Sequence, residues 1–210
     1  IVECAVVSIF GNTKRYPEVK DTEVLNGKEA LTGYLKTDGN YIPRTAVWSK
    51  LFKRDIISDL TFPKGEIHED YMFTVTAMYR AKKVAIIHKG LYFHLYTNPD
   101  SITNANFSLK DLYRVKQLKN IAELMRCKGS DEQYKYALAN YYRGIIKYYY
   151  LCSGKYDDKA KEFRKILLEE KNTIIISKLP AKKRFEIILI RKIPRVYLIC
   201  RHGFNMLRNT

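Results

Sequence analysis

Hydrophobic and polar positions in the first hundred residues predict a sheet built from short strands. Residues 1–10 are almost continuously apolar, which is typical of a buried strand. Residues 46–52 alternate apolar and polar side chains, as a half-buried strand does. Two further apolar runs, residues 84–87 and 91–96, predict two strands on either side of Gly90.

Two helices are expected between these strands. The first covers residues 26–35, with Asn26 as its N-cap, because a short polar side chain there can accept a hydrogen bond from a free backbone N–H. A short helical turn follows from Asp55. The second helix covers residues 69–80. Its apolar face is expected to contain Met72, Val75 and Tyr79, with Phe73 and Ala77 beside them.

From residue 108 onward the pattern is helical throughout. Polar capping residues, apolar steps of three and four, and a glycine stop predict successive helices. Their starts are expected near Ser108, Ser130, Asp157 and Pro180, with a break at Pro194. The chain therefore divides into a mixed α/β part, residues 1–105, and a helical region, residues 106–210.

Composition places the chain among globular proteins and adds one unusual feature. The 210 residues are 46% hydrophobic, which excludes a disordered tail, but the formal net charge is +16. Residues 171–210 hold ten Lys and Arg against one acid. A charge of this kind favours a polyanionic partner, namely nucleic acid, an anionic bilayer or a phosphorylated ligand.

The sequence also bears on location. It shows no secretory signal and no apolar run of the roughly 20 residues that span a bilayer, and its four cysteines are scattered without CxxC spacing. These features predict a cytoplasmic protein with reduced cysteines. The abrupt start within a strand predicts a fragment.

The best candidates for chemistry are His68, Glu69 and Asp70, which directly precede a helix. Free N–H groups and the helix dipole at that end stabilise an anion and are expected to keep the acid ionised. A carboxylate held in this way can accept a proton from a substrate hydroxyl. The alternative is that these acids only cap the helix.

These residues belong to a longer resemblance. The run Trp48-Ser-Lys-Leu-Phe-Lys-Arg54, then Phe62-Pro-Lys-Gly65, then His68-Glu-Asp70 with Phe73 nearby, resembles family 2 glycosyltransferases of the capsule and cell-wall type. The strands that follow, the Asp-Ser-Ile at 100–102 and the opening Ile-Val-Glu-Cys are also similar. The match covers residues 1–105 in order. It implies a partial A-type glycosyltransferase (Rossmann-like) domain, followed here by a C-terminal helical bundle.

The resemblance implies a role for each matching residue. Asp70 would be the general base of an inverting transfer, with Glu69 supporting it. Trp48 and His68 would contact the acceptor, Trp48 by stacking on a sugar ring, unless it is a plain core tryptophan. Lys50 would be structural or would contact the acceptor or phosphate. His94 would be a late metal or diphosphate contact, or a hydrogen-bonded structural residue.

One departure from the family pattern limits this reading. The family binds its nucleotide-diphosphate sugar through an N-terminal half, where an Asp-x-Asp motif holds a divalent metal, Mg or Mn. This sequence contains no Asp-x-Asp. The metal of a complete enzyme would be held mostly by residues absent here, and the chain alone is not expected to transfer a hexose or amino-hexose to its glycan acceptor.

The basic C-terminal segment predicts a second kind of surface. Arg184, Arg191 and Arg195 are spaced by seven and four residues, beside an apolar stripe one position further round. Such a helix can lie on an anionic membrane, which would place the protein at the inner membrane face. Alternatively, the stripe packs internally. The apolar stripe consists of Phe185, Leu189, Val196, Cys200 and Leu207.

Two alternatives use the same charge. One is a non-catalytic membrane- or partner-binding module built around the basic helices. The other is a nucleic-acid binder, in which tyrosines such as Tyr141 and Tyr148 would stack on bases. The sequence argues against the second, because it has no recognisable nucleic-acid-binding motif and most of these tyrosines fall at core spacing.

Overall fold

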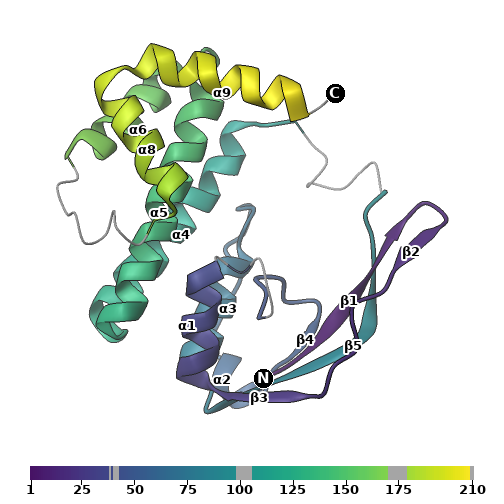
Figure 1. Ribbon diagram of the computed structural model, residues 1–210. Helices are drawn as coiled ribbons and strands as arrows, with labels where there is room; N and C mark the ends of the chain where they lie inside the picture. The colour runs from purple at the N-terminus through teal and green to yellow at the C-terminus, as the bar shows by residue number, and fades with distance from the viewer. Residues whose placement is uncertain (38, 40–42, 98–105, 170–178, 209–210) are drawn as a thin grey trace. The chain divides into compact units, whose positions relative to one another are not determined.

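The computed structural model describes residues 1–37, 39, 43–97, 106–169 and 179–208, with the backbone alone for 204–208. The chain divides into two compact units, Ile1–Ile121 and Ala122–Thr210. The architecture is mixed α/β with a curled mixed sheet and helices toward the C-terminus (Figure 1), as the sequence predicted at that level. Each unit is described separately below.

Unit 1 is built on a small curled sheet. Strands β1 and β5 are parallel, while β2 and β4 pair with β1 and β3 pairs with β5, all three antiparallel. Helices α1 and α3 lie on the concave side of the curl (Figure 1). The strands are β1 (Val2–Phe10), β2 (Thr13–Arg15), β3 (Glu23–Asn26), β4 (Lys50–Leu51) and β5 (Lys83–Leu95).

Strand β5 is one strand of 13 residues, so the prediction of two strands was wrong. Its pairing with β1 jumps from Cys4↔Ile87 to Ala5↔Gly90 and then to Val6↔Tyr92. These bulges absorb the extra residues without ending the strand. Gly90 makes the close approach possible, since a Cβ there would lie 2.5 Å from the Val7 side chain.

The strand predicted over residues 46–52 is also mostly wrong. Only Lys50 and Leu51 pair with β1, and residues 47–49 form a turn. The alternating pattern predicts that apolar residues are buried and polar ones exposed. In the structure the polar Lys50 is buried while the apolar Leu51 is 76% exposed. Lys50 is buried because it pairs with Glu3, a residue distant in sequence.

Helix α1 (Gly27–Thr37) begins where the sequence placed it. Asn26 Oδ1 accepts a hydrogen bond from the Glu29 amide at 2.9 Å, and the Glu29 carboxylate accepts one from the Asn26 amide at 3.1 Å. This reciprocal pair is a capping box. Gly27 lies against the Ala81 carbonyl, where any Cβ would clash. The helix therefore packs very closely against the chain that enters β5.

Helix α3 (Asp70–Arg80) forms as predicted but buries a different face. Tyr71, Thr74, Val75 and Met78 are buried, whereas Met72 is half-buried and Tyr79 is 42% exposed. The sequence pattern weighed only apolar residues. Thr74 can be buried because its hydroxyl donates to the Thr45 carbonyl at 2.7 Å. A short helix, α2 (Arg54–Ile57), precedes this part of the chain.

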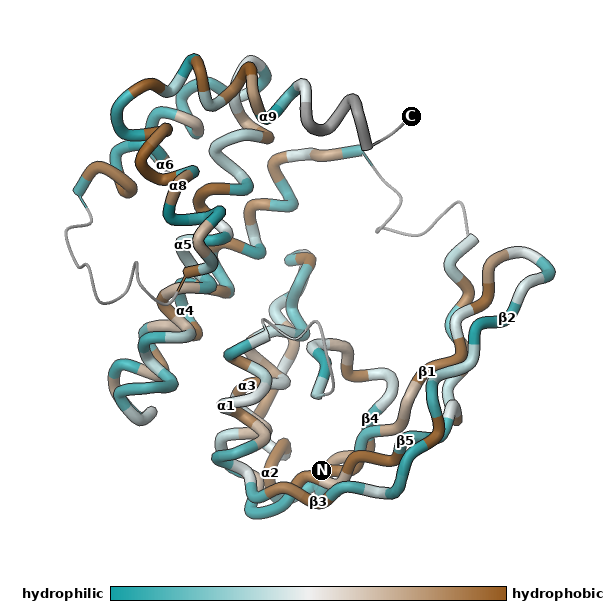
Figure 2. The backbone as a smooth tube through the Cα atoms, in the orientation of Figure 1, coloured by the Kyte–Doolittle hydropathy of each residue, from teal (hydrophilic) through white to brown (hydrophobic). Residues whose placement is uncertain are grey.

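The remaining described elements are helical, as expected. Helix α5 is buried on more than one face and packs against α6 and α8 in unit 2, which makes it the central helix there. In Figure 2, hydrophobic and hydrophilic stretches alternate along α8 and α9. The elements are η2 (Leu109–Leu112), α4 (Tyr113–Lys128), α5 (Asp131–Cys152), α6 (Asp157–Glu169), α8 (Ala181–Lys192) and α9 (Pro194–Arg208).

The predicted helix boundaries in this part are confirmed. Ser130 accepts from the Gln133 amide at 3.2 Å and its own amide donates back to the Gln133 side chain at 3.0 Å. Helix α4 stops before Gly129, and α9 begins at Pro194 after a break. Among the described helices, none is both long and apolar enough to cross a membrane. Cys127 and Cys200 are exposed, whereas Cys152 is buried.

Candidate functional site

Asp70 is the first residue of α3 and is half-buried. The chain turns sharply on its way into the helix, at Gly65 with φ of 79° and again at His68 with φ of 63°. A left-handed backbone is uncommon for a residue other than glycine, and such strain is often found at functional sites. His68 is half-buried, with its ring edge-on to Tyr71 at 6.0 Å.

Burial raises the pKa of Asp70 above its ordinary value, and the neighbouring Glu69 raises it further. A backbone hydrogen bond and the charges of Lys50 and Arg114 lower the pKa, but they do not outweigh the loss of solvent. The helix N-terminus is therefore not the dominant influence on the pKa of Asp70, and its ionised state stays a prediction. A carboxylate with a raised pKa is a stronger proton acceptor once it is ionised.

Lys50 forms a buried ion pair with Glu3. Its Nζ lies 3.3 Å from Glu3 Oε2, and both side chains are fully shielded from solvent. Nζ also donates to the Ala46 carbonyl at 2.6 Å, and the Arg44 amide donates to the Glu3 carboxylate at 3.0 and 3.2 Å. Burial raises the pKa of Glu3 and lowers that of Lys50.

This enclosure puts Lys50 in a structural position. Its predicted contact with an acceptor or a phosphate would require the surrounding segment to open. Lys50 still acts on the candidate site, because its charge opposes the rise in the pKa of Asp70.

The turn that carries Trp48 is held against α3 at two places. On one side of Trp48, Thr45 accepts the hydrogen bond from Thr74, one helical turn after Asp70. On the other side, Lys50 lies within electrostatic reach of Asp70. Trp48 thus belongs to the segment that lines the start of α3.

Trp48 belongs to a continuous row of aromatic rings, which we call the aromatic row: Phe10, Trp48, Tyr92, His94 and Tyr96. Trp48 stacks on Tyr92 with centroids 4.4 Å apart and on His94 at 4.8 Å. His94 meets Tyr96 edge-on at 4.5 Å, and Tyr96 stacks on Phe10 at 4.9 Å. Trp48, Phe10 and Tyr96 are 38 to 42% exposed, so Trp48 is not a plain core tryptophan.

The sequence missed most of this row. Tyr92 and His94 alternate along β5 and therefore share one face of it, and Tyr96 follows with the same spacing just after the strand, which is a readable signal. Trp48 and Phe10 come from other segments, and only the fold brings them there. Because neighbouring residues of a strand point to opposite faces, Phe93 lies on the other side.

The Phe-Pro-Lys-Gly segment is anchored close to Asp70. Phe62 stacks on Phe73 of α3 at 4.5 Å, and Phe52 meets the same ring edge-on at 5.5 Å. Glu66 is paired with Lys116 and accepts from Gln117 Nε2 at 3.2 Å. The loop that leads into His68 and Asp70 is thus fixed by both α3 and the first half of α4.

No three His, Cys, Asp or Glu side chains come together as a metal site within the described part of the chain. His94 is engaged in ring contacts, and its role toward a metal stays a prediction. Comparison with known proteins adds no further assignment, since no family model and no curated protein sequence matches the chain.

The basic residues predicted to face a membrane do not lie alike. Arg184 and Arg195 are exposed, but Arg191 is half-buried and its Nε donates to the Leu167 carbonyl at 2.7 Å. Arg164 of α6 strengthens the contact with α8 by donating to the carbonyls of Ile190 and Arg191, each at 3.1 Å. Arg191 therefore ties α8 to the end of α6.

The predicted apolar stripe and the tyrosines also differ from expectation. Phe185 and Val196 are exposed at 59% and 43%, while the residues that pack inward are Ile187, Ile190 and Tyr197. Four of the five α5 tyrosines considered for base stacking are buried, so they offer no open ring faces. These four are Tyr141, Tyr142, Tyr148 and Tyr149.

Proposed function

We propose that this chain forms the acceptor side of an inverting, family 2-type glycosyltransferase. The enzyme would transfer a hexose or amino-hexose from a nucleotide-diphosphate sugar to a surface polysaccharide or lipid-linked glycan. The observation that carries the proposal is the half-buried Asp70 at the start of α3, with a raised pKa, next to the segment that bears an exposed tryptophan.

Asp70 acts as the general base in this proposal. Its carboxylate takes the proton from an acceptor hydroxyl as that oxygen bonds to the anomeric carbon of the donor sugar. The bond from that carbon to the diphosphate breaks, and the nucleoside diphosphate leaves with the electron pair. Glu69 assists because its negative charge makes Asp70 hold a proton more strongly.

The aromatic row supplies the acceptor surface. A sugar ring presents C–H groups that pack on a flat aromatic face, and Trp48 is both flat and exposed. Tyr92 to Leu95, the end of β5, spans about 10 Å at about 3.3 Å per residue, and Tyr96 extends the row beyond it, so the row is longer than one sugar ring. His68 precedes Asp70 by two residues in sequence. In this proposal it also contacts the acceptor.

A divalent metal bound by the donor half would neutralise the departing diphosphate. Within this chain, the tasks that remain are holding the acceptor and accepting its proton. Both can be tested separately, since they involve different residues.

The decisive experiment compares Asp70→Asn with Asp55→Asn in a form of the protein that also carries the donor half. Asp55 is an exposed acid of the same unit. We expect D70N to lower the transfer rate by about 100-fold or more, the contribution typical of a general base, while D55N leaves it unchanged. If D70N transfers sugar at the wild-type rate, Asp70 is not the base and the proposal fails.

A further inference from the structure

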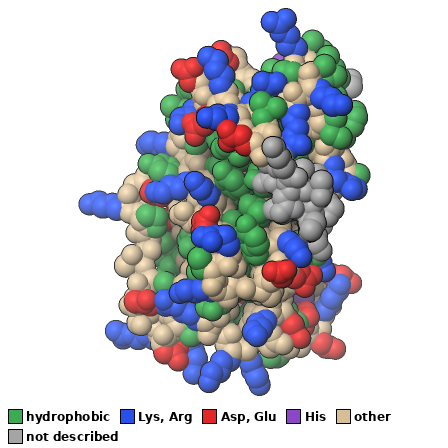
Figure 3. All heavy atoms as spheres, turned by 90° about the vertical axis from the view of Figure 1, so that its left-hand side faces the viewer, with side chains coloured by type: hydrophobic (Ala, Val, Ile, Leu, Met, Phe, Trp, Pro, Cys, Tyr) green, Lys and Arg blue, Asp and Glu red, His purple; other side chains and the backbone are tan. Residues whose placement is uncertain are grey.

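The two C-terminal helices expose several large apolar side chains. Figure 3 shows one face of the molecule, on which hydrophobic, basic and acidic side chains are mixed. In and between α8 and α9, five of the described exposed side chains are large and apolar, alongside exposed lysines and arginines. The five apolar side chains are Phe185 (59% exposed), Ile188 (50%), Ile193 (47%), Val196 (43%) and Ile199 (72%).

These side chains are additional to the apolar residues that hold the helices in place. Ile187, Ile190 and Tyr197 face inward and are at most 2% exposed. The exposed residues are spaced by three, five, three and three, which keeps them on the outward side of each helix. We call this set the outward face. Large apolar side chains exposed on the outward side of successive helices favour an interaction site.

The exposed charge on the described residues of the same helices has a single sign. Lys182, Arg184, Lys192 and Arg195 are all exposed. The one acid among residues 171–210 is Glu186, which is 6% exposed. Lys183 Nζ donates to both of its oxygens at 2.9 Å, and the Tyr197 hydroxyl donates to it at 3.3 Å. The described exposed residues of α8 and α9 therefore include no negative charge.

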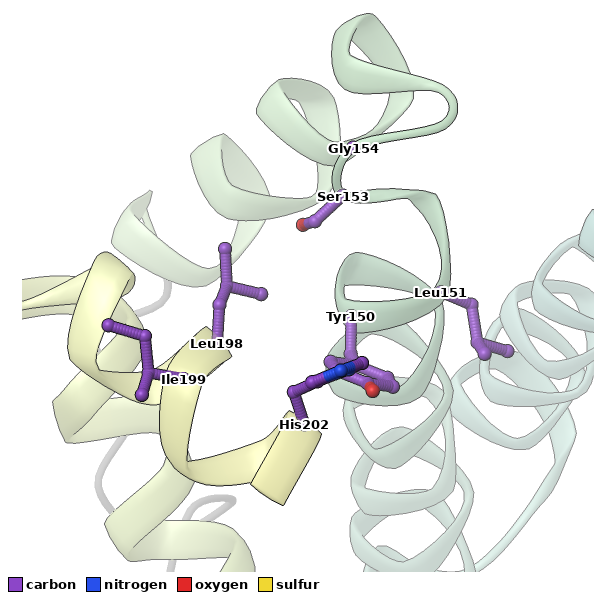
Figure 4. Close-up of a pocket in the computed structure, with 7 residues that line it drawn as sticks. All are labelled: Tyr150, Leu151, Ser153, Gly154, Leu198, Ile199 and His202. Atoms are coloured by element: carbon purple, nitrogen blue, oxygen red, sulfur yellow. The ribbon is translucent and has the colours of Figure 1, made fainter. Parts of the chain in front are cut away.

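A hollow continues the apolar surface at one end. It has a volume of about 610 Å³ and lies between the end of α5 and α9. Figure 4 shows Leu198 and Ile199 of α9 on one side and Tyr150 with Leu151 of α5 on the other, with Gly154 at the turn that follows. Ile199 thus belongs both to the hollow and to the outward face.

We propose that the outward face of α8 and α9 docks on an anionic lipid bilayer. The helices lie in the plane of the headgroups, with the apolar residues at the acyl boundary and the cations among lipid phosphates. Aliphatic side chains interleaved with cations suit a bilayer better than a nucleic acid, which favours stacking rings and has no apolar layer. The proposal does not depend on glycosyl transfer.

The test measures binding of the full 210-residue chain to sedimented vesicles. Vesicles of phosphatidylcholine with phosphatidylglycerol are compared with phosphatidylcholine alone, at low and high salt. We expect binding at least tenfold tighter to the anionic vesicles, with the difference shrinking at high salt. Each cation near an anionic surface strengthens binding about fivefold, so the double variant Arg184→Gln, Arg195→Gln should bind about 25-fold more weakly.

Two further variants separate the outward face from net charge. Lys161→Gln with Lys165→Gln removes the same charge from α6, where both lysines are more than 75% exposed, and should change binding less than threefold. Ile188→Ser with Ile199→Ser keeps the charge but removes apolar contact, and should weaken binding about tenfold or more. All these side chains are exposed, and circular dichroism should confirm that each variant folds.

Three results would overturn the proposal. The first is equal weakening by the α6 and α8–α9 charge variants, which would mean that net charge alone drives binding. The second is unchanged binding of the serine variant. The third is tighter binding to a DNA oligonucleotide than to anionic vesicles at the same salt concentration, with loss of that binding on changing Arg184 and Arg195.

Discussion

Lys50 and Glu3 form an ion pair whose side chains are both completely shielded from water, with 3.3 Å between Nζ and Oε2. Removing two charges from water is costly, and the pair is tolerated because each partner also has backbone hydrogen bonds. It links β1 to the turn that carries Trp48. The pair therefore connects the centre of the sheet to the candidate acceptor surface.

Glu3→Leu should destabilise unit 1 by about 3–5 kcal/mol, because it leaves the Lys50 ammonium buried without its counter-charge. The double variant Glu3→Leu, Lys50→Met should recover most of that loss, since neither charge remains. Chemical denaturation of the three proteins checks both statements. A double variant as unstable as the single one would show that the hydrogen bonds, rather than the charges, hold this region.

Asp70→Asn should make the protein more stable at pH 7. The pKa of Asp70 is raised in the folded state, so the folded state favours the protonated form. Above that pKa the ionised carboxylate destabilises the folded state. Wild-type stability from this group is fully present below the ordinary value of 3.8 and is lost as pH rises through the folded pKa. Asparagine carries no charge, so the variant does not lose this stability at high pH.

The measurement is the difference in unfolding free energy between D70N and wild type, at pH 7 and near pH 3.5. Taking the difference cancels the other titrating groups. The gain should be present at pH 7 and should vanish at the lower pH. A variant that is less stable than wild type at pH 7 would contradict the direction of the pKa shift.

Acceptor binding should be visible through Trp48. It is the single tryptophan of the chain, so fluorescence excited selectively at tryptophan, and not at the 17 tyrosines, reports on the aromatic row. Titration with glycan fragments should change the emission, and His94→Ala should weaken binding by about 2- to 12-fold, because a stacked aromatic pair is worth about 0.5–1.5 kcal/mol beyond its buried area. Phe93→Ala is the matched control, since Phe93 is exposed on the opposite side of β5. Equal losses in the two variants would count against the row as the binding surface.

Two glycines of α1 should respond in opposite ways to alanine. Gly27→Ala places a methyl group against the Ala81 carbonyl and should destabilise the protein by about 1–3 kcal/mol. Gly33→Ala meets no atom within 4 Å and should stabilise it by about 0.5–1 kcal/mol, because alanine favours a helix interior. Thermal unfolding checks both. If Gly33→Ala also destabilises, the close packing is not confined to the start of the helix.

The elements that were predicted correctly depend on residues close in sequence. Asn26 and Ser130 each form a capping box with a partner three residues away, and Pro194 stops α8 by its own ring and missing N–H. The signal for such features is complete within a few residues. Helix existence and helix ends could therefore be predicted along most of the chain.

The predictions that failed depend on distant partners. Lys50 is buried because of Glu3, 47 positions earlier, and the pattern of residues 46–52 contains no trace of that pair. The burial that raises the pKa of Asp70 also comes from the fold around it and cannot be read from its neighbours in sequence. The aromatic row likewise joins Phe10, Trp48 and Tyr92 only after three segments meet.

The bulged part of β5 separates two regions of the strand. Between its pairing with Cys4 and its pairing with Val6, β5 advances five residues while β1 advances two. A codon gained or lost between His88 and Leu91 would change the size of the bulge, while the pairs on either side could keep their register. The rings beyond Gly90 can therefore diverge during evolution, by changes in length as well as by substitution, without disturbing the packing of the first half of the sheet.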